Sequence, residues 1–136
     1  MKKILFAASE AVPFMKTGGL ADVTGSLPKY FDKKNYDVRV ILPKYVCMEE
    51  RWKGQLHFLC HFYVNLSWRK QYVGIFETTY DGITYYLVDN EFYFAGNAPY
   101  NNIYEDVEKF AFFSKAVLEA LPYLDFCPDI IHCHYW

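Results

Sequence analysis

The sequence predicts an α/β protein with an open, mostly parallel β-sheet and one antiparallel hairpin excursion. Two apolar runs, residues 3–8 and 36–43, flank a helical pattern, and this strand–helix–strand order is typical of parallel sheets. Further along, the pair Asp81-Gly82 separates two runs rich in β-forming residues, which indicates an antiparallel hairpin. A chain of 136 residues can bury the core of one domain, so we expect a single domain over residues 1–136.

The first strand leads into a loop that carries two adjacent glycines. Residues 3–8 are apolar throughout, which is the pattern of a strand covered on both faces of a parallel sheet. Ser9 and Glu10 end the strand, and residues 10–19 form a loop that contains Pro13. We therefore expect this loop to lie at the carboxyl end of the first strand.

A helix and a second strand complete the first unit. Helical spacing predicts a helix from about residue 19 to 31, and Pro28 should kink or shorten its last turn. The strand at 36–43 then ends at a proline. Such crossovers are almost always right-handed, and ligands bind these sheets at the carboxyl ends of the strands. The apolar positions of the helical pattern are Leu20, Val23, Leu27 and Phe31.

The middle of the chain has antiparallel character. Residues 56–66 alternate loosely and are rich in Phe and Tyr, and residues 71–78 predict a further strand. The turn at 79–82 holds the Asp-Gly pair, which supplies the positive φ that a tight turn needs. Residues 83–88 predict the returning strand.

A long loop and a helix follow. The polar loop at 89–104 has a length that is often associated with function. The helix predicted at 104–121 ends at Pro122, and Glu105 and Lys109 form a favourable i,i+4 pair on it. The apolar face expected for this helix consists of Val107, Phe110, Val117, Leu118 and Leu121.

Residues 129–134 predict a buried strand close to the end of the chain. A strand followed at once by a chain end is unusual for a complete α/β domain. We therefore expect a domain that is truncated at its C-terminus, with downstream helices and a second domain absent.

Composition excludes several classes of function. The formal net charge is -2, and no basic stretch is interleaved with aromatics, which argues against nucleic-acid binding. No stretch approaches the length of a membrane span, and the first apolar run is too brief for a signal peptide. The four cysteines contain no CxxC pair, so we expect reduced, mostly buried thiols in a cytoplasmic protein. The high aromatic content, 21%, fits either an aromatic core or a sugar-stacking surface.

The main candidate for a binding site is Lys16-Thr17-Gly18-Gly19 with Asp22. Glycines directly before a helix let backbone approach a ligand, and the first N–H groups of the helix point at that ligand. Lys16 adds positive charge and favours a phosphate-bearing ligand, although a solvated lysine beside a plain turn is the alternative. Asp22 either stabilises the helix start or accepts hydrogen bonds from sugar hydroxyls. The stretch is neither a Walker A loop nor a GxGxxG fingerprint.

Two histidines lie on the final strand. His132 and His134 alternate there, so we expect them to point to opposite faces, with one reaching the crevice of Lys16. A core or capping histidine is the alternative. A metal site that includes Cys133 is disfavoured, because successive strand residues cannot all face one ion, and we expect no metal.

Other candidates lie at the middle strands. Asp89 and Asn90 close the strand at 83–88 and either start a turn or make polar contacts at the same edge of the sheet. Trp52 and Trp68 are candidates for stacking on sugars, with a structural role as the alternative.

In combination, these motifs resemble those of bacterial glycogen synthases and plant starch synthases. Lys16 to Val23 resembles the KTGGL signature, and Asp129 to Trp136 resembles the PDxxHxHDW segment. Tyr135 stands where the family usually has aspartate, so no role is assigned to a carboxylate there. The further segments that fit the family pattern in order are Leu87 to Asn90, Phe92 to Phe94 and Asp106 to Ser114.

The resemblance implies a GT-B enzyme with two Rossmann-like domains, of which this chain is the N-terminal half. Such enzymes transfer glucose from ADP-glucose to the non-reducing end of an α-1,4-glucan (glycogen) with retention, and need neither metal nor cofactor. By match, Lys16, Gly18 and Gly19 contact the nucleotide sugar, Asp22 lies near its glucose, and His134 lies beside the donor glucose. The base pocket belongs to the second domain, so the ADP preference comes from the resemblance alone. By itself the chain is expected to be inactive.

Two other interpretations stay open. One is a non-catalytic α/β module that holds glucan or sugar phosphate. A second domain of roughly 200 residues or more after residue 136 would favour the enzyme over this module. The other is an unrelated nucleotide-binding protein such as an epimerase, which predicts a dinucleotide glycine pattern that the sequence lacks.

Overall fold

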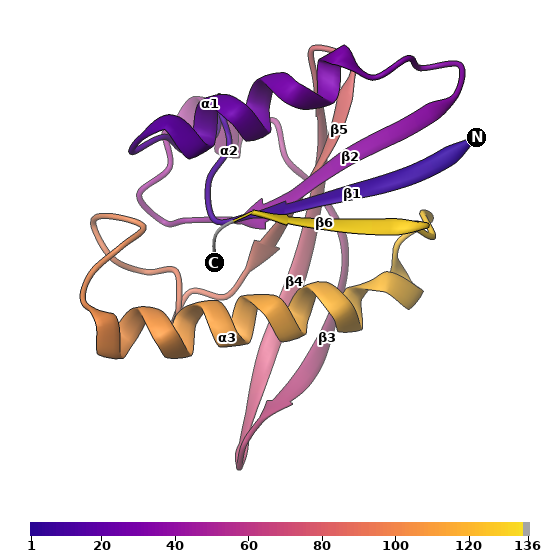
Figure 1. The fold of residues 1–136 in the computed structure, drawn as a ribbon. Helices are drawn as coiled ribbons and strands as arrows, with labels where there is room; N and C mark the ends of the chain where they lie inside the picture. The colour runs from indigo at the N-terminus through magenta and orange to yellow at the C-terminus, as the bar shows by residue number, and fades with distance from the viewer. Residues whose placement is uncertain (135–136) are drawn as a thin grey trace.

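The computed structural model, which describes residues 1–134, is a three-layer α/β fold (Figure 1). Its sheet has six strands in the order β3-β4-β5-β2-β1-β6, with α1 and α3 on opposite faces, which confirms the predicted fold class. The strands are β1 (Lys2–Ala8), β2 (Tyr36–Pro43), β3 (His57–Leu66), β4 (Arg69–Tyr80), β5 (Ile83–Asp89) and β6 (Ile130–His134). The helices are α1 (Gly19–Ser26), α2 (Glu50–Lys53) and α3 (Ile103–Ala120), with 3-10 turns η1 (Leu27–Tyr30) and η2 (Leu121–Tyr123).

The parallel half of the sheet is centred on β1. This strand pairs in parallel with β2 on one side and β6 on the other, and β2 pairs in parallel with β5. Alternate residues of β1 point to opposite faces, where Phe6 joins one core cluster and Leu5 the other. Burial on both faces explains why the sequence of β1 is a continuous apolar run.

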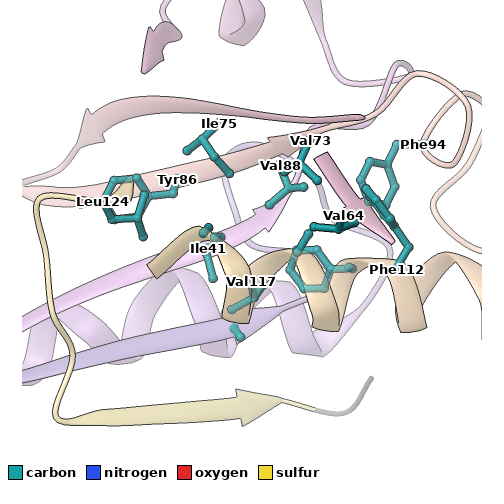
Figure 2. Close-up of a cluster of buried hydrophobic side chains, with 14 of the residues drawn as sticks. Ile41, Val64, Val73, Ile75, Tyr86, Val88, Phe94, Phe112, Val117 and Leu124 are labelled. Carbon is teal, nitrogen blue, oxygen red and sulfur yellow. The ribbon is translucent and has the colours of Figure 1, made fainter. Parts of the chain in front are cut away.

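The larger core cluster lies between α3 and the sheet (Figure 2). Phe112 and Val117 of α3 face Ile41 of β2 and Val88 of β5 in this cluster. Phe94, which comes from the loop before α3, is only 1% exposed and packs against Phe112. Aromatic residues therefore fill much of this core. This agrees with the first of the two explanations for the high aromatic content, an aromatic core.

The antiparallel excursion is confirmed, and it is longer than predicted. Asp81 and Gly82 have φ values of 54° and 80° between β4 and β5, as a two-residue hairpin turn requires. A second turn, at Ser67 with φ of 60°, joins β3 to β4. The sequence signals this second turn poorly because Ser67-Trp68 lacks glycine, proline, asparagine and aspartate.

The buried face of α1 differs from the prediction. The α-helix ends at Ser26, and Pro28 lies in η1, so the proline shortens the helix as expected. However, Val23 is 48% exposed and Leu27 is 37% exposed, whereas small residues are buried. This small face allows the preceding loop to approach closely, and the Val12 N–H donates to the Ala21 carbonyl at 3.1 Å. The helix residues that are buried are Ala21, Thr24 and Gly25.

Helix α3 has nearly the predicted bounds, but two of the residues predicted for its buried apolar face are exposed. Val107 is 54% exposed and Leu118 is 60% exposed. Lys109 does not pair with Glu105; it is 5% exposed and lies 3.5 Å from the Asp106 carboxylate. Within residues 1–134, no helix is long and apolar enough to cross a membrane.

Two further predictions about burial are wrong. Strand β6 occupies an edge of the described sheet, and most of its residues are exposed rather than buried. The four cysteines are free, as expected, but Cys127 and Cys133 are exposed and the other two are half-buried.

We predict that Gly25→Ala destabilises the fold. A Cβ at this position would overlap Cγ2 of Val12 and lie 2.8 Å from the carbonyl oxygen of Val12, so the loop or the helix would have to move. Overpacking of this kind costs about 1–3 kcal/mol in the free energy of unfolding, which urea denaturation measures.

Gly54→Ala is the matched control. A Cβ there would meet only the Glu50 carbonyl, at 3.8 Å, and φ is already -67°. The expected change is less than about 1 kcal/mol. Equal unfolding midpoints for the two variants would show that α1 and the loop are not tightly packed.

Candidate functional site

The candidate site lies at the edge of the sheet where the parallel strands end. Strands β1, β2, β5 and β6 are parallel neighbours, so their last residues lie along one edge. The chain leaves β1 at this edge, and the last part of the connecting loop, residues 16–19 (the glycine loop), enters α1. This is the edge where open α/β sheets bind ligands, as the sequence predicted.

A hollow of about 510 Å³ opens beside the glycine loop. Gly18 is the N-cap of α1 in extended conformation, and among residues 1–134 no side chain caps the first N–H groups of the helix. A Cβ added at Gly18 or Gly19 would meet nothing within 4 Å, and neither residue has a positive φ. The residues that line the hollow are Glu10, Thr17, Gly18, Gly19, Leu20, Tyr100 and Asp106.

Neither the backbone conformation nor the packing of residues 1–134 therefore requires the two glycines. A larger residue would only fill open space at the mouth of the hollow. The missing side chains leave the backbone N–H groups at the start of α1 accessible to a ligand. These N–H groups also carry the positive end of the helix dipole, which favours an anion.

Lys16 and Asp22 are brought together by the fold. The Lys16 ammonium lies 2.9 Å from the Asp22 carboxylate, and both side chains are more than half exposed. An exposed ion pair of this kind contributes little to stability, so a ligand can displace it at low cost. Asp22 also lies in the first turn of α1, where a negative charge is favourable.

Glu10 belongs to the site, whereas the sequence pattern identifies it only as the end of a strand. Its carboxylate is 1% exposed and accepts hydrogen bonds from the Thr17 hydroxyl at 2.5 Å and the Gly18 N–H at 3.2 Å. Its carbonyl oxygen accepts a hydrogen bond from Thr24 of α1 at 2.6 Å. A glutamate two residues after a continuous apolar strand is the sequence signal for this role, because a buried charge needs partners.

Tyr100 connects the long loop to the end of β1. Its hydroxyl lies 2.6 Å from the Ser9 hydroxyl and 3.0 Å from the Glu10 carboxylate. Burial, together with the negative charge of Glu10, raises the pKa of Tyr100 to about 12, so the phenol stays protonated near neutral pH. The hydrogen bond from Tyr100 to Glu10 therefore supports the prediction that the loop at 89–104 contributes to the site.

A buried ion pair on α3 holds the end of this loop. Lys109 donates to the Pro99 carbonyl and to the Asn101 side chain, each at 2.7 Å. Asp106 accepts from the Asn101 N–H at 3.0 and 3.1 Å and lies beside the Lys109 ammonium. Because every polar end is engaged, the pair can be buried, and it fixes the backbone on both sides of Tyr100.

Asp89 and Asn90 lie at the same edge but do not line the hollow. Asp89 is half-buried at the end of β5, two strands and therefore about 10 Å from β1. Burial raises the pKa of its carboxyl, while nearby Lys44 acts in the opposite direction. Asn90 accepts from the N–H groups of Phe92 and Tyr93 and donates to a β4 carbonyl, so its amide organises the turn after β5. A direct ligand contact by either residue stays a prediction.

The expectation that His132 and His134 point to opposite faces is wrong. Residues two apart on a strand share a face, and the two rings lie 4.5 Å apart and 5.0 Å from Phe6. His132 is exposed and His134 is half-buried, with Nε2 buried and without a hydrogen-bond partner among residues 1–134. Burial and the neighbouring His132 lower the pKa of His134 below its usual 6.5. The departure at Tyr135 lies outside the described residues.

The tryptophans have separate environments. Trp52 packs against Phe14 and Tyr80 in the core on the α1 side, so its role is structural. Trp68 is 82% exposed at the β3–β4 turn, with Arg69 over its ring. Among residues 1–134 there is no group of three or more His, Cys, Asp or Glu side chains that could hold a metal ion.

These features define an α/β domain that presents a glycine loop and a helix start at the carboxyl edge of a mostly parallel sheet. Residues 3–136 match the family described as the starch synthase catalytic domain. The chain therefore belongs to this family.

Relatives and a solved structure agree with this assignment. The chain is 68% identical over its full length to a glycogen synthase of Lachnoclostridium phytofermentans and 62% identical to one of Lachnospira eligens. It spans 28% of the length of each. It also resembles the catalytic domain of starch synthase IV from Arabidopsis thaliana bound to ADP and acarbose. The TM-score is 0.79 at 28% identity, over 99% of this chain and 28% of that one.

We predict that His132→Gln raises the pKa of His134 toward its usual value. The substitution removes the neighbouring positive charge but leaves the burial in place, so the recovery is partial. An NMR titration of the imidazole measures the change. Cys133→Ser, on the opposite face of β6, is the control and should leave the pKa unchanged.

The same lowered pKa sets a pH dependence of stability. The unfolded chain binds the His134 proton more readily than the folded chain, so this contribution to stability is present above about pH 6.5 and declines as the pH falls below it. A His134 pKa at or above 6.5 in the folded chain would contradict the assignment.

Proposed function

We propose that this chain is the N-terminal, Rossmann-like domain of a glycogen (starch) synthase with the GT-B arrangement. The complete cytoplasmic enzyme would transfer glucose, with retention, from ADP-glucose to the non-reducing end of an α-1,4-glucan. The family assignment supports this activity, and the ADP and acarbose bound to the Arabidopsis thaliana enzyme support a nucleotide and a glucan-like ligand.

One observation carries the proposal: the space beside Gly18 and Gly19 is open. The glycines serve no conformational or packing need within the described chain, yet they leave the start of α1 exposed next to Lys16. Such an arrangement favours a ligand that brings negative charge to within hydrogen-bond distance of backbone. The diphosphate of a sugar nucleotide has this property.

The charges around the hollow suggest how the donor is oriented. Glu10 and Asp106 line the hollow, and their negative charges disfavour a phosphate group beside them. Lys16 directly precedes the lining residue Thr17, and together with the start of α1 it forms the positively charged side of the site. We therefore place the diphosphate against Lys16 and the start of α1, with the glucose near Asp22 and His134.

This orientation has a chemical consequence. When the bond between glucose and the diphosphate breaks, negative charge develops on the departing diphosphate. Lys16 and the helix N–H groups stabilise this charge without having to reorganise. The remaining cationic groups and the base pocket are assigned to a second domain across the cleft.

We predict that Lys16→Ala in the full-length polypeptide lowers kcat/KM for ADP-glucose by about 10²-fold. Removal of a preorganised electrostatic contact to developing charge has an effect of this size. Steady-state glucosyl transfer with varied ADP-glucose measures it.

Lys29→Ala is the matched control. Lys29 is also an exposed lysine in an ion pair, 2.7 Å from Asp81, but it lies outside the candidate site. Its removal changes the net charge equally and should leave kcat/KM within about twofold. Similar losses in both variants would indicate a non-specific charge effect, and normal kinetics of Lys16→Ala would refute the assignment.

We predict that residues 1–136 alone bind ADP-glucose weakly and do not transfer glucose. The hollow presents only one wall of the proposed cleft, so much of the donor stays in water. Calorimetric titration of the isolated chain beside the full-length polypeptide measures the difference. Tight binding by residues 1–136 would contradict the two-walled cleft.

A second candidate function is a non-catalytic module that holds glucan. A separate hollow of about 450 Å³ lies near Phe92 and Tyr104, which are 66% and 87% exposed, with Glu105 and Glu108 beside them. Aromatic rings next to carboxylates suit sugar rings. Glucan binding without any transfer activity in the full-length polypeptide would favour this function.

A further inference from the structure

The Glu10 carboxylate connects the glycine loop with the long loop before α3. It accepts hydrogen bonds from Thr17 and Gly18 of that loop and from Tyr100 of the long loop. The side chain is almost wholly buried at 1% exposure. A buried carboxylate without such donors would be costly, so the three hydrogen bonds and the burial depend on one another.

The contact with Gly18 decides which N–H groups remain for a ligand. Because the Gly18 N–H is directed at Glu10, it cannot also face an anion at the mouth of the hollow. The N–H groups that follow, at the start of α1, have no partner within the helix and are presented outward. Glu10 thus sets the orientation of the loop at the point where the helix begins.

The contact with Tyr100 connects the two sides of the hollow. Gly18 and Gly19 form one side, and Tyr100 and Asp106 contribute to the other. The backbone next to Tyr100 is held independently by the buried Asp106–Lys109 pair. Tyr100 therefore has a fixed position, and its hydrogen bond restrains the Glu10 carboxylate.

We propose that Glu10 is a positioning residue for the sugar nucleotide, acting through the backbone of the glycine loop rather than through contact with the donor. This inference rests on the proposed function, because it names the residue that orients the loop for the same ligand. Loss of the carboxylate frees the Gly18 N–H and separates the two sides of the hollow. Binding of the donor then requires the loop to be ordered first, which weakens binding without altering the glucan site.

The test compares Glu10→Ala with Glu10→Gln in the full-length polypeptide. Alanine removes all three acceptor contacts, and we expect it to raise KM for ADP-glucose at least tenfold. Glutamine keeps an oxygen for the Gly18 N–H, and the hydroxyls of Thr17 and Tyr100 can turn to accept from its amide. We therefore expect glutamine to stay within about threefold of the unchanged protein, with KM for glucan unchanged in both variants.

A second readout does not depend on activity. Hydrogen exchange of the amides of residues 16–20 should become faster in Glu10→Ala and remain slow in Glu10→Gln, while exchange in β1 and β2 is unaffected. Tyr100→Phe should raise KM for ADP-glucose about threefold. Tyr85→Phe is its control: the Tyr85 hydroxyl is buried without a hydrogen-bond partner among residues 1–134, so its removal should leave KM unchanged.

Each result decides the proposal. If Glu10→Gln is as defective as Glu10→Ala, a charge or proton-transfer role replaces the positioning role. If Glu10→Ala leaves donor KM and amide exchange unchanged, the proposal is wrong, and if it does not fold, Tyr100→Phe and Glu10→Gln still decide. If the unchanged protein transfers no glucose, the proposed function fails, while amide exchange still tests whether Glu10 orders the loop.

Discussion

The site depends on the close approach of the loop after β1 to helix α1. Gly25 has no room for a Cβ against Val12, and the Val12 N–H donates to Ala21 of the helix. Thr24 completes the contact by donating its hydroxyl to the Glu10 carbonyl. A face of small residues on α1 is therefore what allows the backbone after β1 to pass beneath the helix and turn into the glycine loop.

Beyond this contact, buried polar groups hold two further segments in place, the glycine loop and the long loop before α3. Glu10 orders the glycine loop through Gly18, and it reaches Tyr100 on the opposite side of the hollow. On that opposite side, Asp106 and Lys109 hold the loop against α3. Apolar packing places the helices on the sheet, and these few charged groups then determine the shape of the space between them.

The sequence predicted the sheet, the crossover and the position of the glycine loop because these depend on local patterns. Period-2 and period-3.6 spacing, the Asp-Gly turn and the paired glycines are such patterns. The prediction of which face of α1 is buried was wrong. Val23 fits the spacing of an apolar helical stripe but is exposed, whereas the buried contact is made by Gly25 against Val12 of the preceding loop. The roles of Glu10 and Tyr100 depend on residues 90 positions apart, which no local pattern reveals.

If the site binds a sugar nucleotide as proposed, the ion pair between Lys16 and Asp22 has a consequence for the anions it selects. An anion that approaches Lys16 meets a lysine whose charge is already neutralised, so binding is an exchange of one negative partner for another. A singly charged ion gains little from this exchange, whereas a group with two or more negative charges retains a net attraction. The displaced Asp22 carboxylate then becomes available to accept hydrogen bonds from the rest of the same molecule. Under the proposed function, the pair would therefore favour a diphosphate attached to a hydroxyl-rich group over singly charged anions.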